Sequence, residues 1–192
     1  MEAPPSGEIT VLIEAARAGR KDALDRLLDA VYPSFRTLAS HLLRNERDDH
    51  TMQSTDLVHE AVIRLFLQSE VEMKNRLHMM ALAGRQMRRI LVEHARARLA
   101  QRRGGGVPTD QLVENQDVSA QELESLLVLD DLLAQLRQMD ARAAEVVELR
   151  FFSGLSREEI SDKLGVTVRT VQRDWDAARA WLLDALDSSK SE

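Results

Sequence analysis

The chain has 192 residues, of which 44 % are apolar and 30 % are charged, and it contains no cysteine. This length suits one or two small domains with cores of their own, and the lack of cysteine excludes disulfides and thiolate metal sites. No segment has the length and apolarity of a membrane span, and the N-terminus lacks the features of a signal peptide. These absences lead us to expect a cytoplasmic protein. Because Ala, Leu, Arg and Glu are abundant and favour helices, we also expect an all-α fold.

The net charge of −6 conceals two segments of opposite sign. Residues 85–103 hold seven arginines and one glutamate, whereas residues 104–149 hold two basic and ten acidic side chains. Helix surfaces that serve only solubility usually mix both signs in i, i+4 pairs. Several arginines on one helix instead favour phosphate binding, so we expect nucleic acid at the first segment.

The first half of the chain is predicted to form helices. Ser6 can cap a first helix, which Gly19 ends. A second helix is expected over residues 22–45, with a kink or a short break at Pro33. After a polar loop, a third helix starts at Ser54 or Thr55.

The third helix has a broad apolar face and a second face of mixed character. The second face carries two aliphatic side chains flanked by charged ones: Asp56, Glu60, Ile63, Arg64 and Leu67. Such a face is typical of a surface that binds a partner, although scattered exposed aliphatics are also common. Both interpretations stay open from these residues alone.

A fourth helix is expected over residues 76–103. Its core face carries five apolar residues, Met80, Ala83, Met87, Ile90 and Ala97. On the far side, an arginine row lies within about 40° at 3.6 residues per turn, and it comprises Arg85, Arg89, Arg96 and Arg103, with Arg88 beside it. His94 points toward the apolar side and is predicted to pack in the core.

Three glycines at 104–106 and Pro108 end this helix. Residues 104–119 are predicted to form a flexible acidic linker, which separates a first domain, 1–103, from a second domain, 120–192. The second domain begins with a leucine-rich helix, and Asp140 can cap the next helix, which Gly154 ends.

Residues 156–183 contain the most specific motif of the chain, a helix-turn-helix. Ser156 and Glu159 can form a capping box, Gly165 supplies the positive φ at which a helix ends, and Thr167 can cap a second helix. The apolar stripe of that helix comprises Val168, Val171, Trp175 and Ala178.

The start of the second helix carries the side chains expected to read DNA. In a helix-turn-helix these N-terminal residues enter the major groove, and here they are Arg169, Thr170, Gln172 and Arg173. Arginine can bond guanine through two hydrogen bonds, and glutamine can do so with adenine. An ordinary helical hairpin is the alternative, but it requires neither the paired caps nor the basic helix start.

Three segments in this order resemble the sigma factors of bacterial RNA polymerase in their small two-domain form, the extracytoplasmic-function (ECF) group. DLVHEAVIRLF is similar to the polymerase-docking segment, and RRILVEHARARLAQRRGGG is similar to the promoter-melting helix. The stretch from DARAAEVVELRFF to RDWDAARAWL is similar to the C-terminal DNA-binding domain. The resemblance covers about residues 8–187. Two segments, RRILVEHARAR and VELRFFSGLS, look closest to a branch of the family found alongside eukaryotic-type protein kinases.

The resemblance implies a role for each set of residues. The docking set, Asp56, Glu60, Ile63, Arg64 and Leu67, would bind the clamp helices of the largest polymerase subunit. The −10 promoter element would contact Lys74, Asn75, Arg76, Arg85, Arg88, Arg89 and Arg96, with the loop 73–76 holding an extruded base. The −35 element would be read by Arg169, Thr170, Gln172 and Arg173, and the acidic linker would lie near the nascent RNA.

Many ECF sigma factors, the group that this chain resembles, carry acidic residues at the positions of Ser54 and Thr55. Phosphorylation of either residue would add about −1.5 to −2 charge at a helix N-terminus, and it is a candidate switch for polymerase binding. The simpler interpretation is that both are ordinary N-caps.

We therefore predict a non-enzymatic alternative sigma factor whose partners are core RNA polymerase and promoter DNA. An anti-sigma factor or a Ser/Thr protein kinase is a further candidate partner, and no cofactor, metal or membrane is expected. The alternative is a free-standing helix-turn-helix regulator. An enzyme that uses His59 or His94 is disfavoured, since the sequence has no nucleophile set or phosphate loop. The acidic segment also predicts that the free protein binds duplex DNA poorly.

Overall fold

A computed structural model of the chain is all-α, and it describes residues 6–43, 52–67, 73–103 and 120–189. Within these ranges every regular element is a helix or a helical turn, and no strand occurs. The expected fold class is therefore confirmed. The predicted linker, 104–119, lies outside the described residues, so the domain boundaries stay predictions.

The N-terminal helical group comprises the elements up to residue 103. These are α1 (Ser6–Arg17), α2 (Lys21–Leu42), α3 (Ser54–Val62), the π-helical turn η1 (Ile63–Leu67) and α4 (Arg76–Arg103). Helices α1 and α2 form a hairpin, and α3 packs on both α2 and α4. The predicted bounds of the fourth helix are confirmed.

The C-terminal helical group comprises the elements from residue 120 onward. These are α5 (Ala120–Met139), α6 (Ala141–Val147), the π-helical turn η2 (Glu148–Phe152), α7 (Arg157–Leu164) and α8 (Val168–Ser189). Asp140 caps α6 as predicted, since its carboxylate accepts a hydrogen bond of 2.9 Å from the backbone N–H of Ala143. Helix α8 packs against both α6 and α5.

Of the two outcomes expected at Pro33, the short break is wrong, because α2 continues through this residue, and the kink stays a prediction. A proline inside a helix costs about 3 kcal/mol through its missing N–H and its ring. The apolar face of α2 offsets this cost, because Val31 and Phe35 on either side of the proline are fully buried. The predicted end of the helix at residues 44–45 lies outside the described residues.

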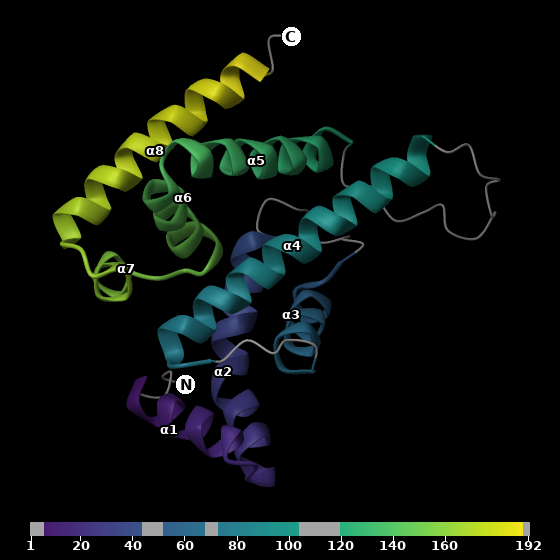
Figure 1. Cartoon of the computed structure of the whole chain (residues 1–192). Helices are drawn as coiled ribbons and strands as arrows, with labels where there is room; N and C mark the ends of the chain where they lie inside the picture. The colour runs from purple at the N-terminus through teal and green to yellow at the C-terminus, as the bar shows by residue number, and fades with distance from the viewer. Residues whose placement is uncertain (1–5, 44–51, 68–72, 104–119, 190–192) are drawn as a thin grey trace.

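The two helical groups share one apolar core. Val146, Leu149, Leu155 and Ile160 of the C-terminal group are buried in the same cluster as the core side chains of α1 to α4, among them Phe35. Figure 1 shows α4, in teal, running between the first helices and the green and yellow C-terminal group. Helix α4 is therefore covered on two sides.

This double coverage changes the expected core face of α4. Met80, Ala83, Met87 and Ile90 are buried as predicted, but Ala97 is exposed. Ala95 and Leu99 are buried in its place, because Leu123 of α5 packs against them. His94 is half-buried, and this burial, together with the positive charge of Arg98, lowers the pKa of its imidazole.

Candidate nucleic-acid interface

Helices α7 and α8 and the turn between them are consistent with the predicted helix-turn-helix, and local signals fix the end of α7 and the start of each helix. The hydroxyl of Ser156 accepts the N–H of Glu159 at 3.1 Å, and the carboxylate of Glu159 accepts the N–H of Ser156 at 2.9 Å. Gly165 ends α7 in the left-handed region with φ of 65°, which a side chain would strain. The hydroxyl of Thr167 then accepts the N–H of Thr170 at the start of α8.

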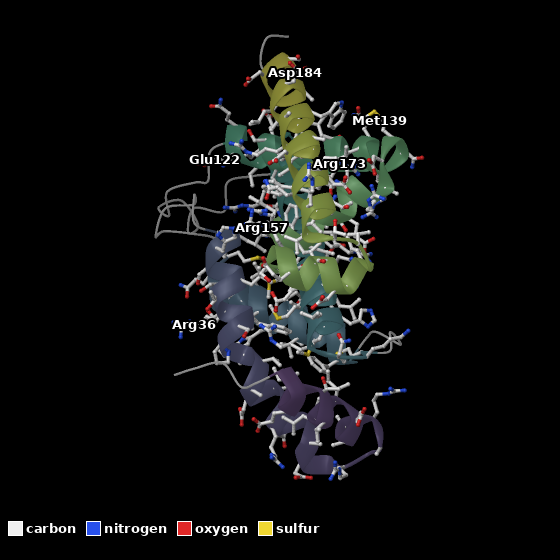
Figure 2. All side chains as sticks on the ribbon, turned by 90° about the vertical axis from the view of Figure 1, so that its left-hand side faces the viewer. Arg36, Glu122, Met139, Arg157, Arg173 and Asp184 are labelled. Atoms are coloured by element: carbon white, nitrogen blue, oxygen red, sulfur yellow. The ribbon has the colours of Figure 1, made fainter. Side chains whose placement is uncertain are left out.

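The four residues expected to read the −35 element line one surface hollow at the start of α8: Arg169, Thr170, Gln172 and Arg173. The two arginines are exposed, and Arg173 retains 68 % of its side-chain exposure. In Figure 2, α7 and α8 lie toward the viewer, with Arg157 and Arg173 on them. This face is open to a ligand.

Val168 does not belong to the apolar stripe in which the sequence analysis placed it. It is 38 % exposed and lines the same hollow. As the first residue of α8 it lies beyond the area that α7 covers, and burial begins at Val171, which is fully buried. Gln172 bridges the two helices of the motif, since it accepts from Arg157 and donates to Asp176, each at 2.8 Å.

Asp174 fixes the recognition helix from its buried side. Its side chain is 4 % exposed and accepts from Arg142 of α6 at 2.6 Å and from Arg173 at 3.0 Å. Burial favours the neutral form of this carboxyl, but the hydrogen bonds from Arg142 and Arg173 outweigh burial and lower the pKa of Asp174. The contact holds α8 against α6 and orients Arg173.

Four of the five arginines expected to contact the −10 element have a different environment, because carboxylates of the C-terminal group bind them. Arg88 donates to Asp130 at 2.6 Å and also to Glu148. Arg85 lies 3.5 Å from Glu145 and 3.7 Å from Glu148.

The same pattern extends along α4 in both directions. Arg96 lies 3.3 Å from Asp130, and at the other end Arg76 lies 2.7 Å from Glu159 of α7. Burial raises the pKa of Glu159, whereas its hydrogen bonds with Ser156 and Arg76 lower it, and the net direction is downward. Glu159 therefore takes part both in the capping box of α7 and in the contact between the two helical groups.

Glu148 is the centre of this charged interface. Its side chain is only 6 % exposed, and besides Arg85 and Arg88 it lies 2.7 Å from Arg137 of α5. Three guanidinium groups therefore surround one buried carboxylate, which compensates its loss of hydration.

The remaining −10 candidates lie outside this interface. Arg89 pairs with Glu93 of its own helix at 2.8 Å and keeps 71 % exposure of its side chain. Lys74 and Asn75 are exposed in the turn before α4, where the amide oxygen of Asn75 accepts the N–H of His78 at 2.9 Å. Of the seven predicted −10 residues, four face the C-terminal group and three face outward.

Gly84 lies where the backbones of the two groups meet. A Cβ atom at this position would overlap the carbonyl group of Phe152 and the hydroxyl of Ser153. Only glycine allows α4 and η2 to approach this closely. The contact continues with Arg88, whose guanidinium lies 5.4 Å from the centroid of the Phe152 ring.

The residues predicted to dock polymerase lie on α3 and η1. Ile63 is 40 % exposed, and beside it Arg64 bonds Glu60 and Glu93, each at 2.8 Å. The hydrogen bonds from Arg64 and Arg89 lower the pKa of Glu93. Leu67 is the last residue of η1.

The start of α3 differs from the simple capping interpretation. Gln53 occupies the N-cap position, so Ser54 and Thr55 are the first two helical residues rather than N-caps. Asp56 bonds back to the N–H of Gln53 at 3.1 Å. Its carboxylate is therefore partly used within the helix start, although the residue itself is exposed.

Sequence reasoning missed the acidic partners of the interface, Asp130, Glu145 and Glu148, and the buried Asp174. The excess of acidic residues in 104–149 indicated that partners for the arginines lie in this segment, but it did not indicate which of the acidic side chains face α4. Among the described residues, no group of His, Asp and Glu side chains is arranged to hold a metal ion. No helix in the described ranges is long and apolar enough to cross a membrane.

Two short-linked helices of this kind, α7 and α8, with arginines at the start of the second, are typical of DNA-binding transcription proteins. The family model of ECF sigma factors matches residues 6–188, and the chain therefore belongs to this family. Its members are non-enzymatic alternative sigma factors that work in transcription initiation with core RNA polymerase and promoter DNA, often under anti-sigma factors. A comparison with curated proteins finds no match.

Proposed function

We propose that the chain binds core RNA polymerase and directs it to a subset of promoters. The observation that carries this proposal is the recognition face of α8, where Arg169, Thr170, Gln172 and Arg173 line one open hollow. Arginine and glutamine side chains at the start of such a helix can read base edges in the major groove. This arrangement supports sequence-specific recognition of the −35 element.

The second part of the proposal is polymerase docking through α3 and η1. Ile63 remains 40 % exposed in the folded chain, and the ion pairs of Arg64 with Glu60 and Glu93 hold charged groups around it. An apolar centre with a charged rim is the usual composition of a protein interface. The exposed Ile63 is therefore the residue whose change should disrupt docking most.

Run-off transcription with core polymerase and a set of genomic promoters tests both parts. The unmodified chain should yield discrete transcripts that core polymerase alone does not, and Ile63→Asp should abolish them. Val11→Asp is the matched control, since Val11 is 58 % exposed on α1, away from the docking face. Promoter binding by the free protein with no effect on polymerase would instead indicate a free-standing regulator.

A further inference from the structure

Gln172 connects the two helices next to the proposed DNA surface. It lies one turn into α8, where it lines the recognition hollow together with Asp176. Its amide oxygen, Oε1, accepts a hydrogen bond from Arg157 at the start of α7, and its amide nitrogen, Nε2, donates one to Asp176, each at 2.8 Å. Arg157 and Asp176 are exposed, and Gln172 is half-buried.

The two neighbours determine which way the amide of Gln172 points. The oxygen and nitrogen ends of an amide have nearly the same shape, so a glutamine without fixed partners can adopt either orientation. Arginine can only donate hydrogen bonds, and a carboxylate can only accept them. The reversed orientation would place donor against donor at Arg157 and acceptor against acceptor at Asp176, and it is therefore disfavoured at both ends.

The amide can bind a base while it stays bonded to both neighbours. A carbonyl oxygen has two lone pairs and an NH2 group has two hydrogens, and the two hydrogen bonds to Arg157 and Asp176 use one of each. A second lone pair and a second hydrogen are what a glutamine needs to bond N6 and N7 of adenine.

A fixed orientation of the amide distinguishes between the two purines. In the major groove adenine presents a donor, N6, beside an acceptor, N7, whereas guanine presents two acceptors, O6 and N7. An amide of fixed direction matches adenine with two hydrogen bonds, but its oxygen meets a second acceptor on guanine. An amide that can turn avoids this repulsion, because it can direct its NH2 group to guanine. The neighbours of Gln172 therefore make its side chain more selective.

We propose that Arg157 and Asp176 are positioning residues that fix the amide of Gln172 and thereby restrict one position of the recognised DNA to adenine. The inference rests on the proposed function in that it takes the hollow of α8 as the DNA surface. It also accounts for a carboxylate in this hollow, where negative charge repels phosphate. Asp176 acts on the base through Gln172 rather than through a contact of its own.

Other contacts fix the two helices independently of this network. The capping box of Ser156 and Glu159 sets the start of α7, and Thr167 sets the start of α8. Asp174, on the buried side of α8, holds this helix against α6. Replacement of either exposed neighbour of the glutamine should therefore leave both helices in place, so that base preference can change without a change in fold.

Removal of both neighbours is the change expected to release the amide. Arg157→Met with Asp176→Ala leaves neither partner, whereas each single replacement leaves one partner that still dictates the direction. The loss of preference should therefore appear mainly in the double variant. Arg157→Lys with Asp176→Glu keeps a neighbour that only donates and one that only accepts, and it should retain the preference.

The matched control is Arg179→Met with Asp184→Ala, which makes the same replacements at exposed positions further along α8. It should keep the base preferences of the parent. Denaturant midpoints of all variants should equal that of this control, which shows that the chain stays folded.

Base preference is measured by selection from a library of DNA duplexes with a randomised segment. The full-length chain is used alone at low salt, where phosphate contacts strengthen binding to any sequence, and in complex with core polymerase. Gln172→Ala identifies the position that Gln172 reads, since the preference there is lost. At that position the parent should favour adenine over guanine about tenfold, and the double variant only about twofold.

Several results would overturn the inference. An adenine preference that persists in the double variant would show that the network does not orient the amide. An equal loss of affinity for every sequence would show that it only joins the two helices. Loss of a cytosine preference in Asp176→Ala would show that Asp176 itself reads a base. A parent in which Gln172→Ala alters no preference would show that Gln172 reads none.

The selection measures binding, whereas run-off transcription measures initiation, so the two proposals fail separately. A chain that selects adenine through Gln172 but does not initiate transcription with core polymerase would refute the proposed function alone. A chain that initiates transcription but whose double variant keeps the adenine preference would refute the positioning role alone.

Discussion

The two surfaces proposed to bind DNA, on α8 and on α4, differ in what their arginines contact. On α8, Arg169 and Arg173 are exposed, and the ion pair of Arg173 is with Asp174 of the same helix. On α4, Arg85 and Arg88 instead pair with acids of the other helical group. The arginines of the first surface point to solvent, whereas several arginines of the second are paired with carboxylates of the C-terminal group.

The difference shows that a basic helix is not by itself an open DNA surface. The fourth helix carries more arginine than α8, yet four of its arginines pair with carboxylates of the C-terminal group. One of these carboxylates, Glu148, keeps only 6 % of its side-chain exposure. The surfaces proposed for the −35 and the −10 element therefore differ in how their arginines are paired. Variants of either surface should have separable effects.

The largest effect is expected at the recognition helix. Arg169→Ala or Arg173→Ala should each cost about 1–3 kcal/mol at a base-contacting position, measured as promoter affinity of the polymerase complex. Arg179→Ala, further along α8, should cost much less. A uniform loss for all three variants would mean that the α8 face contacts only phosphates.

The buried acid beneath that helix should matter for stability. Asp174→Asn removes a charge that Arg142 and Arg173 bind, and we expect a loss of about 1–2 kcal/mol in the free energy of unfolding. Asp184→Asn, at an exposed position of the same helix, is the control. Equal denaturant midpoints for the two variants would contradict this role of Asp174.

On α4, Arg96→Ala should impair strand opening and leave −35 recognition intact. One lost phosphate contact reduces the salt dependence of binding by about one unit of slope. Permanganate reactivity of the −10 region should fall while the −35 footprint persists. Arg36→Ala, at an exposed position on α2, is the control and should change neither the permanganate reactivity nor the footprint. Loss of the −35 footprint in Arg96→Ala would show that the two surfaces do not have separate roles.

A smaller effect is expected at the start of α3. Ser54 and Thr55 are the first two residues of this helix, where negative charge gains about 0.3–1 kcal/mol from the helix dipole. Thr55→Glu and Ser54→Glu should therefore increase polymerase affinity about twofold to fivefold, and Thr55→Ala should not. If the unmodified chain binds as tightly as the Glu variants, phosphorylation there is not a switch.

The smallest effect is expected from pH. The pKa of Glu159 is below its ordinary value of 4.5, so its pair with Arg76 contributes fully above pH 4.5 and is lost as the pH falls through the lower, folded-state pKa. The contribution of this pair to the free energy of unfolding, measured from denaturant midpoints, should stay constant from pH 7 to pH 5 and fall in more acidic solution. A loss already at pH 6 would point to other groups.

Local signals made much of this structure predictable. The caps at Asp140 and Ser156 and the glycine at 165 depend on neighbours in sequence, and all three lie where they were expected. The errors at Pro33 and Ala97 come from burial against distant helices, which periodicity within one helix cannot show.

The candidate site was predictable in composition rather than in arrangement. The positive segment 85–103 and the negative segment 104–149 are visible in the sequence, but their pairing depends on the approach of α4 to η2 at Gly84. A glycine inside a predicted helix indicates that another segment approaches closely, but it does not indicate which segment. Glu148 could be recognised only after the fold brought Arg85, Arg88 and Arg137 around it.

The central claim, that carboxylates of the C-terminal group compete with DNA for four α4 arginines, is tested most directly by the salt dependence of single-stranded DNA binding. The affinity of the parent and of Gly84→Ala is measured from low to moderate salt. Each phosphate contact on a single strand contributes about −0.7 to the slope of log K against log[salt], so four released arginines should steepen the slope by up to about 3. We predict a slope steeper by about 2–3 in Gly84→Ala, and identical slopes with identical affinities would contradict the claim.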